Sequence, residues 1–210
     1  MPKPLKPPQQ SRSQESTARM LDAALTLLDR EGPAGLSIAA VSRESGVSNG
    51  ALYHRFGDRH GLLVAAQDRF LEQVEREWLT TAAPLSTLDD PEELLTRLAE
   101  AFLALFARHR ALFHAFMVTE RADPDLHARG ARTSKRAARL ATRWLTERFD
   151  CTPEAADTAY RMIYAQAVLL VLFSEEETAA LSITPAARLH HVVRALLAIL
   201  RPPTRTHDPR

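Results

Sequence analysis

The chain has 210 residues, of which 45% are hydrophobic, 25% charged and 6% aromatic, a composition typical of a globular helical protein with a real core. Its formal net charge is +1, which excludes a polycation, so any nucleic-acid site must be local. The single cysteine, Cys151, excludes an internal disulfide. The first residues lack the apolar segment of a secretory signal. The apolar run at 167–173 is far shorter than the roughly 18 residues that span a bilayer. We therefore expect a cytoplasmic protein.

Between its two ends the chain has the pattern of helices, with no convincing strand pattern. Apolar residues recur at helical spacing, and several helix starts carry a capping residue followed by Pro or Glu, most clearly at 90–93, DPEE. The ends, 1–12 and 203–210, are rich in proline and polar residues and are expected to be disordered tails. The pattern predicts an all-α fold of about nine helices, at 13–30, 37–45, 48–56, 58–80, 91–108, 110–121, 125–149, 153–175 and 185–201.

Tight turns are concentrated in one part of the chain. Six of the seven glycines lie within 32–61, and the seventh is Gly130. Because glycine marks tight turns, we expect a small N-terminal domain at 13–58 and a larger body of longer helices at 59–202.

The two short helices predicted at 37–45 and 48–56 suit a helix-turn-helix, which needs an abrupt turn between two helices. Gly46 fits that turn because glycine adopts a left-handed backbone at little cost. Three apolar residues of the second helix have the spacing to pack on the first, which offers Ile38 and Val41 in return. The packing residues of the second helix are Val47, Leu52 and Phe56.

The outward side of the second helix suits double-stranded DNA. A recognition helix enters the major groove with its N-terminal residues near the base edges, and its free N–H groups favour phosphate. Gly50 permits a close approach, Asn49 can bind base edges or phosphates, and most protein–DNA hydrogen bonds go to the backbone. The predicted DNA-binding residues are Ser37, Arg43, Ser48, Asn49, Gly50, Tyr53, His54 and Arg59.

The segment GVSNGALYHRFGDRHGLL, 46–63, resembles the signature of the TetR family of bacterial transcriptional regulators. The resemblance covers roughly 13–70. The matching residues are Gly46, Val47, Ser48, Gly50, Leu52, Tyr53, Phe56, Leu62 and Leu63. It implies a helix-turn-helix head on a divergent helical body that binds a ligand and forms a dimer.

The chain departs from that family pattern at several positions. Ala39 stands where the family often has a basic residue, and Ser42 where it often has alanine. The family usually has His, Lys and Glu at the positions of Arg55, Arg59 and His60. The loss of a basic side chain at position 39 shifts the expected base contacts toward Ser48, Asn49 and the N-terminal tail.

The last two predicted helices suggest a dimer face. The helix at 153–175 is apolar on nearly every side, and the helix at 185–201 has a wide apolar stripe. One stripe can face the chain's own core, and the surplus favours a second copy in a four-helix arrangement, although a single buried helix in a monomer would also fit. The predicted interface residues are Tyr164, Val168, Val171, Leu172, Leu189, Val193, Leu196 and Leu200.

The middle helices carry bulky residues that could form either core or a pocket wall. Pockets form between the helices of bundles, so this set is the expected place for an apolar ligand. The predicted pocket residues are Phe102, Phe106, Phe113, His114, Met117, Trp144 and Gln166.

The resemblance implies a homodimeric repressor that leaves a palindromic operator when a small, apolar effector binds, with the long helix at 59–80 as the lever. Two alternatives remain: a helical ligand-binding or adaptor dimer that does not read DNA, and an all-helical enzyme. Against an enzyme, the chain has no HExxH, CxxC, P-loop or GxGxxG motif. Adjacent His190 and His191 lie on different faces of a helix. We therefore expect no catalytic residue, cofactor or metal site.

Overall fold

The structure, a computed structural model, describes residues 9–119, 121–178 and 180–201. Within these ranges it contains ten α-helices, one π-helix and no strand, which confirms the all-α prediction. The elements are α1 (Gln9–Gly35), α2 (Ile38–Ser45), α3 (Asn49–Phe56), α4 (Arg59–Leu85), α5 (Pro91–Arg108), α6 (Arg110–His114), η1 (Ala115–Thr119), α7 (Pro124–Phe149), α8 (Pro153–Leu172), α9 (Glu175–Thr178) and α10 (Pro185–Ile199).

Helix starts agree with the predictions better than helix ends do. Helix α1 begins at Gln9, inside the stretch 1–12 that we expected to be disordered, because no proline follows until Pro33 and glutamine and arginine favour helix. The rest of the two predicted tails lies outside the described residues. Helix α4 continues to Leu85 rather than Thr80, because the expected linker opens with the helix-favouring alanines 82 and 83.

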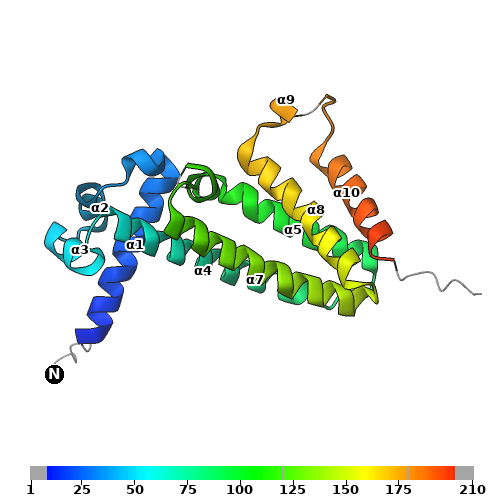
Figure 1. Cartoon of the computed structure of the whole chain (residues 1–210), viewed down its shortest axis with the longest axis horizontal. Helices are drawn as coiled ribbons and strands as arrows, with labels where there is room; N and C mark the ends of the chain where they lie inside the picture. Colours follow the sequence, from blue (N-terminus) through cyan, green and yellow to red (C-terminus); the bar gives the residue numbers. More distant parts are fainter. Residues whose placement is uncertain (1–8, 120, 179, 202–210) are drawn as a thin grey trace, which may run out of the picture. The chain divides into compact units, whose positions relative to one another are not determined.

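The chain divides into two compact units. The first contains the described residues up to Gln73 together with Ala111–Arg129, and Figure 1 shows its helices α1, α2 and α3 in blue to cyan. It is larger than the domain predicted at 13–58 because the first half of α4 supplies core residues: Leu62, Leu63 and Phe70 are at most 1% exposed.

In the first unit the predicted helix at 110–121 is α6 followed by the π-helix η1. Phe113 of α6 and Phe116 of η1 both contact Phe70 of α4, with ring centroids 5.0 and 5.7 Å away. These rings anchor the α6–η1 segment on α4.

The second unit contains Val74–Arg110 and the described residues from Gly130 on. Helices α5, α8 and α10 pack against one another in it (Figure 1). Each of the three begins with a proline that directly follows an N-cap residue. The buried side chains between them form one core, made of Leu95, Ala99, Cys151, Ala156, Ala159, Val193, Leu196 and Leu200.

This core corrects half of the predicted dimer interface. Val171, Val193, Leu196 and Leu200 are at most 3% exposed within one chain, so they cannot offer a surface to a partner. Helix α10 packs against α5 and α8 of the same chain. The other four predicted residues, Tyr164, Val168, Leu172 and Leu189, keep some exposed surface.

Within the described residues, no single helix is long and apolar enough to cross a membrane. Two consecutive helical segments, Pro91–Arg108 and Arg110–Thr119, reach that length and composition only if they are counted as one.

Candidate nucleic-acid interface

Helices α2 and α3 start at the predicted caps. The Ser37 Oγ accepts a hydrogen bond from the Ala40 N–H at 3.1 Å, and the Ser48 Oγ accepts one from the Ala51 N–H at 3.3 Å. Each hydroxyl thus satisfies one of the N–H groups that a helix N-terminus leaves unpaired. Two of the predicted DNA-binding residues therefore also define the ends of the helices that would dock on DNA.

The turn between α2 and α3 is held by backbone geometry and by serine side chains. Gly46 has a φ of 68°, the left-handed conformation that favours glycine. The Ser42 Oγ donates to the Val47 carbonyl at 2.7 Å, and the Ser45 Oγ accepts from the Val47 N–H at 3.3 Å. The serine at position 42 thus closes the turn that alanine could not close in this way.

The inner faces of the two helices pack as predicted. Val41 and Leu52 are fully buried, and Ile38 and Val47 are at most 9% exposed. Phe56, at the end of α3, is half-buried. The buried set fixes which side of α3 faces outward.

The outward side of α3 is polar and exposed. Asn49, Gly50 and His54 are exposed, and Tyr53 is 56% exposed. A Cβ placed on Gly50 would meet nothing within 4 Å, so the fold does not itself require a glycine there. The first turn of α3 carries no acidic residue, so the helix itself places no negative charge at its positive N-terminus.

Helix α3 is tied to α1 by a contact that the sequence did not predict. The Arg55 Nε and one terminal nitrogen of its guanidinium donate to the Thr17 Oγ1 at 2.9 and 2.6 Å. Position 55 is one of the departures from the family pattern. A side chain that reaches a helix 38 residues earlier leaves no local signal in the sequence.

Arg59 has a structural role in addition to the predicted phosphate contact. Its guanidinium donates to the Leu36 carbonyl at 2.9 Å and to the Pro33 carbonyl at 2.7 Å, so it holds the connection between α1 and α2. Arg43 is exposed on α2. The phosphate contacts of both arginines stay predictions.

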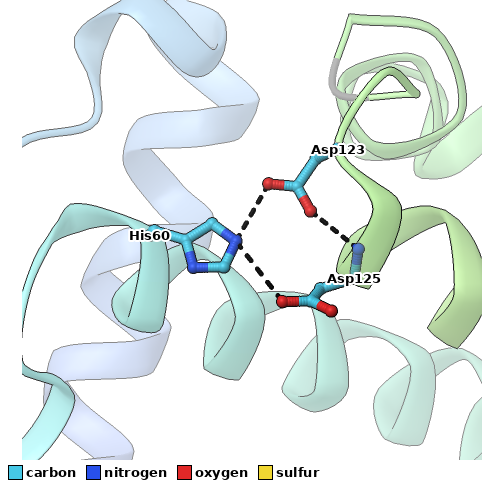
Figure 2. A group of neighbouring side chains, drawn as sticks. All are labelled: His60, Asp123 and Asp125. Atoms are coloured by element: carbon cyan, nitrogen blue, oxygen red, sulfur yellow. Dashed lines mark hydrogen bonds and ion pairs between the residues drawn. The ribbon is translucent and has the colours of Figure 1, made fainter.

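The first turn of α4 meets the start of α7 in a polar cluster that the sequence also did not predict. The His60 Nε2 lies 2.9 Å from an Oδ2 of Asp123 and 4.0 Å from the Oδ2 of Asp125 (Figure 2). About two helix turns further along α4, buried Gln67 donates its side-chain N–H to the Leu126 carbonyl at 3.0 Å. These contacts join segments some sixty residues apart in the sequence.

The predicted ligand-pocket residues fall into both units. Phe113, His114 and Met117 belong to the first, and Phe102, Phe106, Trp144 and Gln166 to the second. Phe106 and Phe113 are buried, whereas His114 is exposed.

An aromatic row crosses α4, α5 and α8 in the second unit. Trp78 contacts Phe102, Phe102 contacts Phe106, and Phe106 contacts Tyr164, with centroid distances of 5.3, 5.1 and 6.0 Å. The row places Tyr164, predicted at the dimer face, beside Phe106, one of the predicted pocket residues.

The chain is similar to known proteins over two different spans. Residues 20–66 match the family model for bacterial regulatory proteins of the tetR family. The HTH-type transcriptional regulator BetI of Vibrio vulnificus (strain YJ016) is 39% identical over 56 residues, which is 27% of this chain and 28% of BetI. The chain thus spans less than a third of that relative's length in the match.

The fold is similar over nearly the whole chain. A proposed TetR-family transcriptional regulator from Mesorhizobium loti MAFF303099 has a TM-score of 0.72 at 18% identity, covering 90% of this chain and 98% of that one. The multidrug binding protein EbrR, complexed with malachite green, has a TM-score of 0.59 at 20% identity, covering 86% and 96%. The match to the tetR family of bacterial regulatory proteins thus lies in the N-terminal helices, at residues 20–66, and the likeness over the rest of the chain is one of fold.

Proposed function

We propose that this protein is a DNA-binding transcriptional repressor that uses the exposed N-terminal face of α3 to bind the major groove of a palindromic operator. The observation that carries the proposal is the contrast between the two sides of α3. Leu52 is fully buried, while Asn49, Gly50 and Tyr53 are exposed at a helix N-terminus that favours phosphate. Open space around Gly50 supports a role outside the chain, because a close approach to DNA would need a residue without a side chain.

The repressor acts as a homodimer in this proposal. Helix α8 supports it, because Met162, Leu169 and Leu172 are 36–38% exposed and lie on one side of the helix at spacings of seven and three residues. Apolar patches of this kind mark interaction sites. Two heads related by a two-fold axis would bind half-sites about 34–36 Å apart, one turn of DNA, or a multiple of that distance.

Control by a small apolar effector completes the proposal. Support comes from the aromatic row at Trp78, Phe102 and Phe106 and from the ligand in the structure of EbrR, a protein of similar fold. Release would follow if the effector bound one arrangement of the two heads better than the other. Helix α4 is the natural lever because it contributes residues to both compact units.

The test measures binding of the full-length protein to a labelled duplex from the region beside its own gene, by fluorescence anisotropy over a range of salt concentrations. Wild type should bind with an affinity that falls as salt rises. Gly50→Ala, Tyr53→Ala and Asn49→Ala should each weaken binding at least about tenfold, which corresponds to about 1.4 kcal/mol.

Gly50→Ala is the sharpest variant because alanine should stabilise α3 by roughly 0.5–1 kcal/mol. Its loss of binding could not then be attributed to unfolding, which a thermal melt checks. His191→Ala, an exposed change on α10, is the control that should bind like wild type. Normal binding by folded Gly50→Ala and Tyr53→Ala would show that α3 is not the recognition helix.

A further inference from the structure

Three metal-ligating side chains meet in the first unit, on elements far apart in the sequence. His60 is in the first turn of α4, Asp123 precedes α7, and Asp125 lies in its first turn. The ligating atoms of all three lie within 4.8 Å of one another, and Figure 2 shows both carboxylates turned toward the imidazole. None of the three belongs to the proposed DNA-binding face.

The backbone of α7 holds one of the carboxylates in place. The Asp123 Oδ1 accepts the N–H of Asp125 at 2.9 Å and of Leu126 at 3.1 Å, which leaves the Oδ2 directed at His60. The carboxylate is therefore held in one orientation, as carboxylates in metal sites usually are.

The donor set fits a divalent transition-metal ion. Two donors about 2.1 Å from one ion in the tetrahedral arrangement typical of zinc are about 3.4 Å apart, so the His60 Nε2 and the Asp123 Oδ2, which lie 2.9 Å apart, need to separate only slightly. The 4.0 Å between His60 and Asp125 requires a small rotation, which is open to the Asp125 side chain because it is 73% exposed. One imidazole nitrogen with two carboxylates suits zinc and its neighbours, whereas Mg²⁺ and Ca²⁺ take oxygen ligands.

We propose that His60, Asp123 and Asp125 bind one divalent transition-metal ion of the zinc type, with water in the remaining positions. The ion would join the first turn of α4, directly after α3, to the first turn of α7. The site stands independently of the proposed DNA binding, and its test uses no DNA.

The test titrates Zn²⁺ into the untagged, chelator-treated full-length protein by isothermal calorimetry at neutral pH, with Co²⁺ absorption as a second probe. Wild type should bind one equivalent. His60→Ala and Asp125→Asn should each weaken binding at least about tenfold; both side chains are largely exposed, so these variants should fold. Zn²⁺ should also raise the melting temperature of wild type, because an ion that binds only the folded state stabilises it, and should leave that of His60→Ala unchanged.

The matched controls are His191→Ala and Asp89→Asn, exposed residues of the same types away from the cluster, and both should bind Zn²⁺ like wild type. The proposal is overturned if wild type binds no Zn²⁺, if His60→Ala and Asp125→Asn bind it normally, or if His191→Ala abolishes binding, which would place the ion on α10.

Discussion

At the scale of single residues, many polar side chains of the head bind the chain's own backbone or hydroxyl groups. Ser42 closes the turn on the Val47 carbonyl, and Arg59 holds two carbonyls before α2. Each such bond contributes about 0.5–1.5 kcal/mol. Together with the Arg55–Thr17 contact they fix α3 on α1, so the exposed side chains of α3 are presented on a rigid support.

Tyr160 of α8 gives the second unit a specific alkaline sensitivity. Burial, aided by Tyr164 and Asp157, raises the pKa of Tyr160 to about 12, whereas an unfolded tyrosine titrates near pH 10. Between these values the folded state keeps a proton that the unfolded state has lost. Stability from this group is therefore complete below about pH 10 and is lost as the pH rises toward 12.

Urea unfolding at pH 9 and pH 11.5 checks this prediction. Wild type should lose more stability over that interval than Tyr160→Phe, which has no phenol to ionise. Equal losses in the two proteins would show that Tyr160 titrates normally.

At the scale of elements, helix starts that carry a cap were more predictable than helix ends. The caps at Ser37, Ser48, Asp90, Thr152 and Thr184 each use one residue and the next few N–H groups, so the signal is local. The end of α4 at Leu85 and the π-helix after His114 depend on packing and weak propensities. Sequence patterns therefore locate the first turn of a helix better than its last.

Leu52 is the fully buried residue of α3 in the helix-turn-helix, and Leu52→Ala should loosen this motif. Leu52 is fully buried on the inner side of α3, and removing such a side chain costs about 2–5 kcal/mol. Hydrogen exchange of the α2–α3 amides, followed by mass spectrometry, should become much faster.

Leu140→Ala is the control for that variant, because Leu140 is 54% exposed on α7 and surface changes usually cost no more than about 0.5 kcal/mol. Fluorescence of Trp78 and Trp144, both in the second unit, should show whether that unit stays folded in Leu52→Ala. Unchanged exchange in α2–α3 would contradict the packing role of Leu52.

At the scale of the whole molecule, α8 has apolar side chains that its own chain leaves partly exposed. Leu169 and Leu172 are each 38% exposed, so Leu169→Glu with Leu172→Glu should leave the monomer folded. Charges on a shared apolar face would separate the proposed dimer. Sedimentation velocity should then give a monomer for this double variant. Wild type and the control Leu140→Glu should give a dimer. A dimer in all three proteins would place the interface elsewhere.

The sequence by itself determined the all-α class and the helix-turn-helix, because caps, a left-handed glycine and apolar spacing are recorded within a few residues of one another. It could not decide which apolar residues of α8 and α10 are core, since the core around Val193 and Leu196 includes residues of α5, such as Leu95 and Ala99, which are distant in the chain. Nor could it predict the cluster of His60 with Asp123 and Asp125, because His60 is some sixty residues away from the two aspartates in the sequence. Only the tertiary structure decided these points, because side chains distant in sequence become neighbours only once the helices pack.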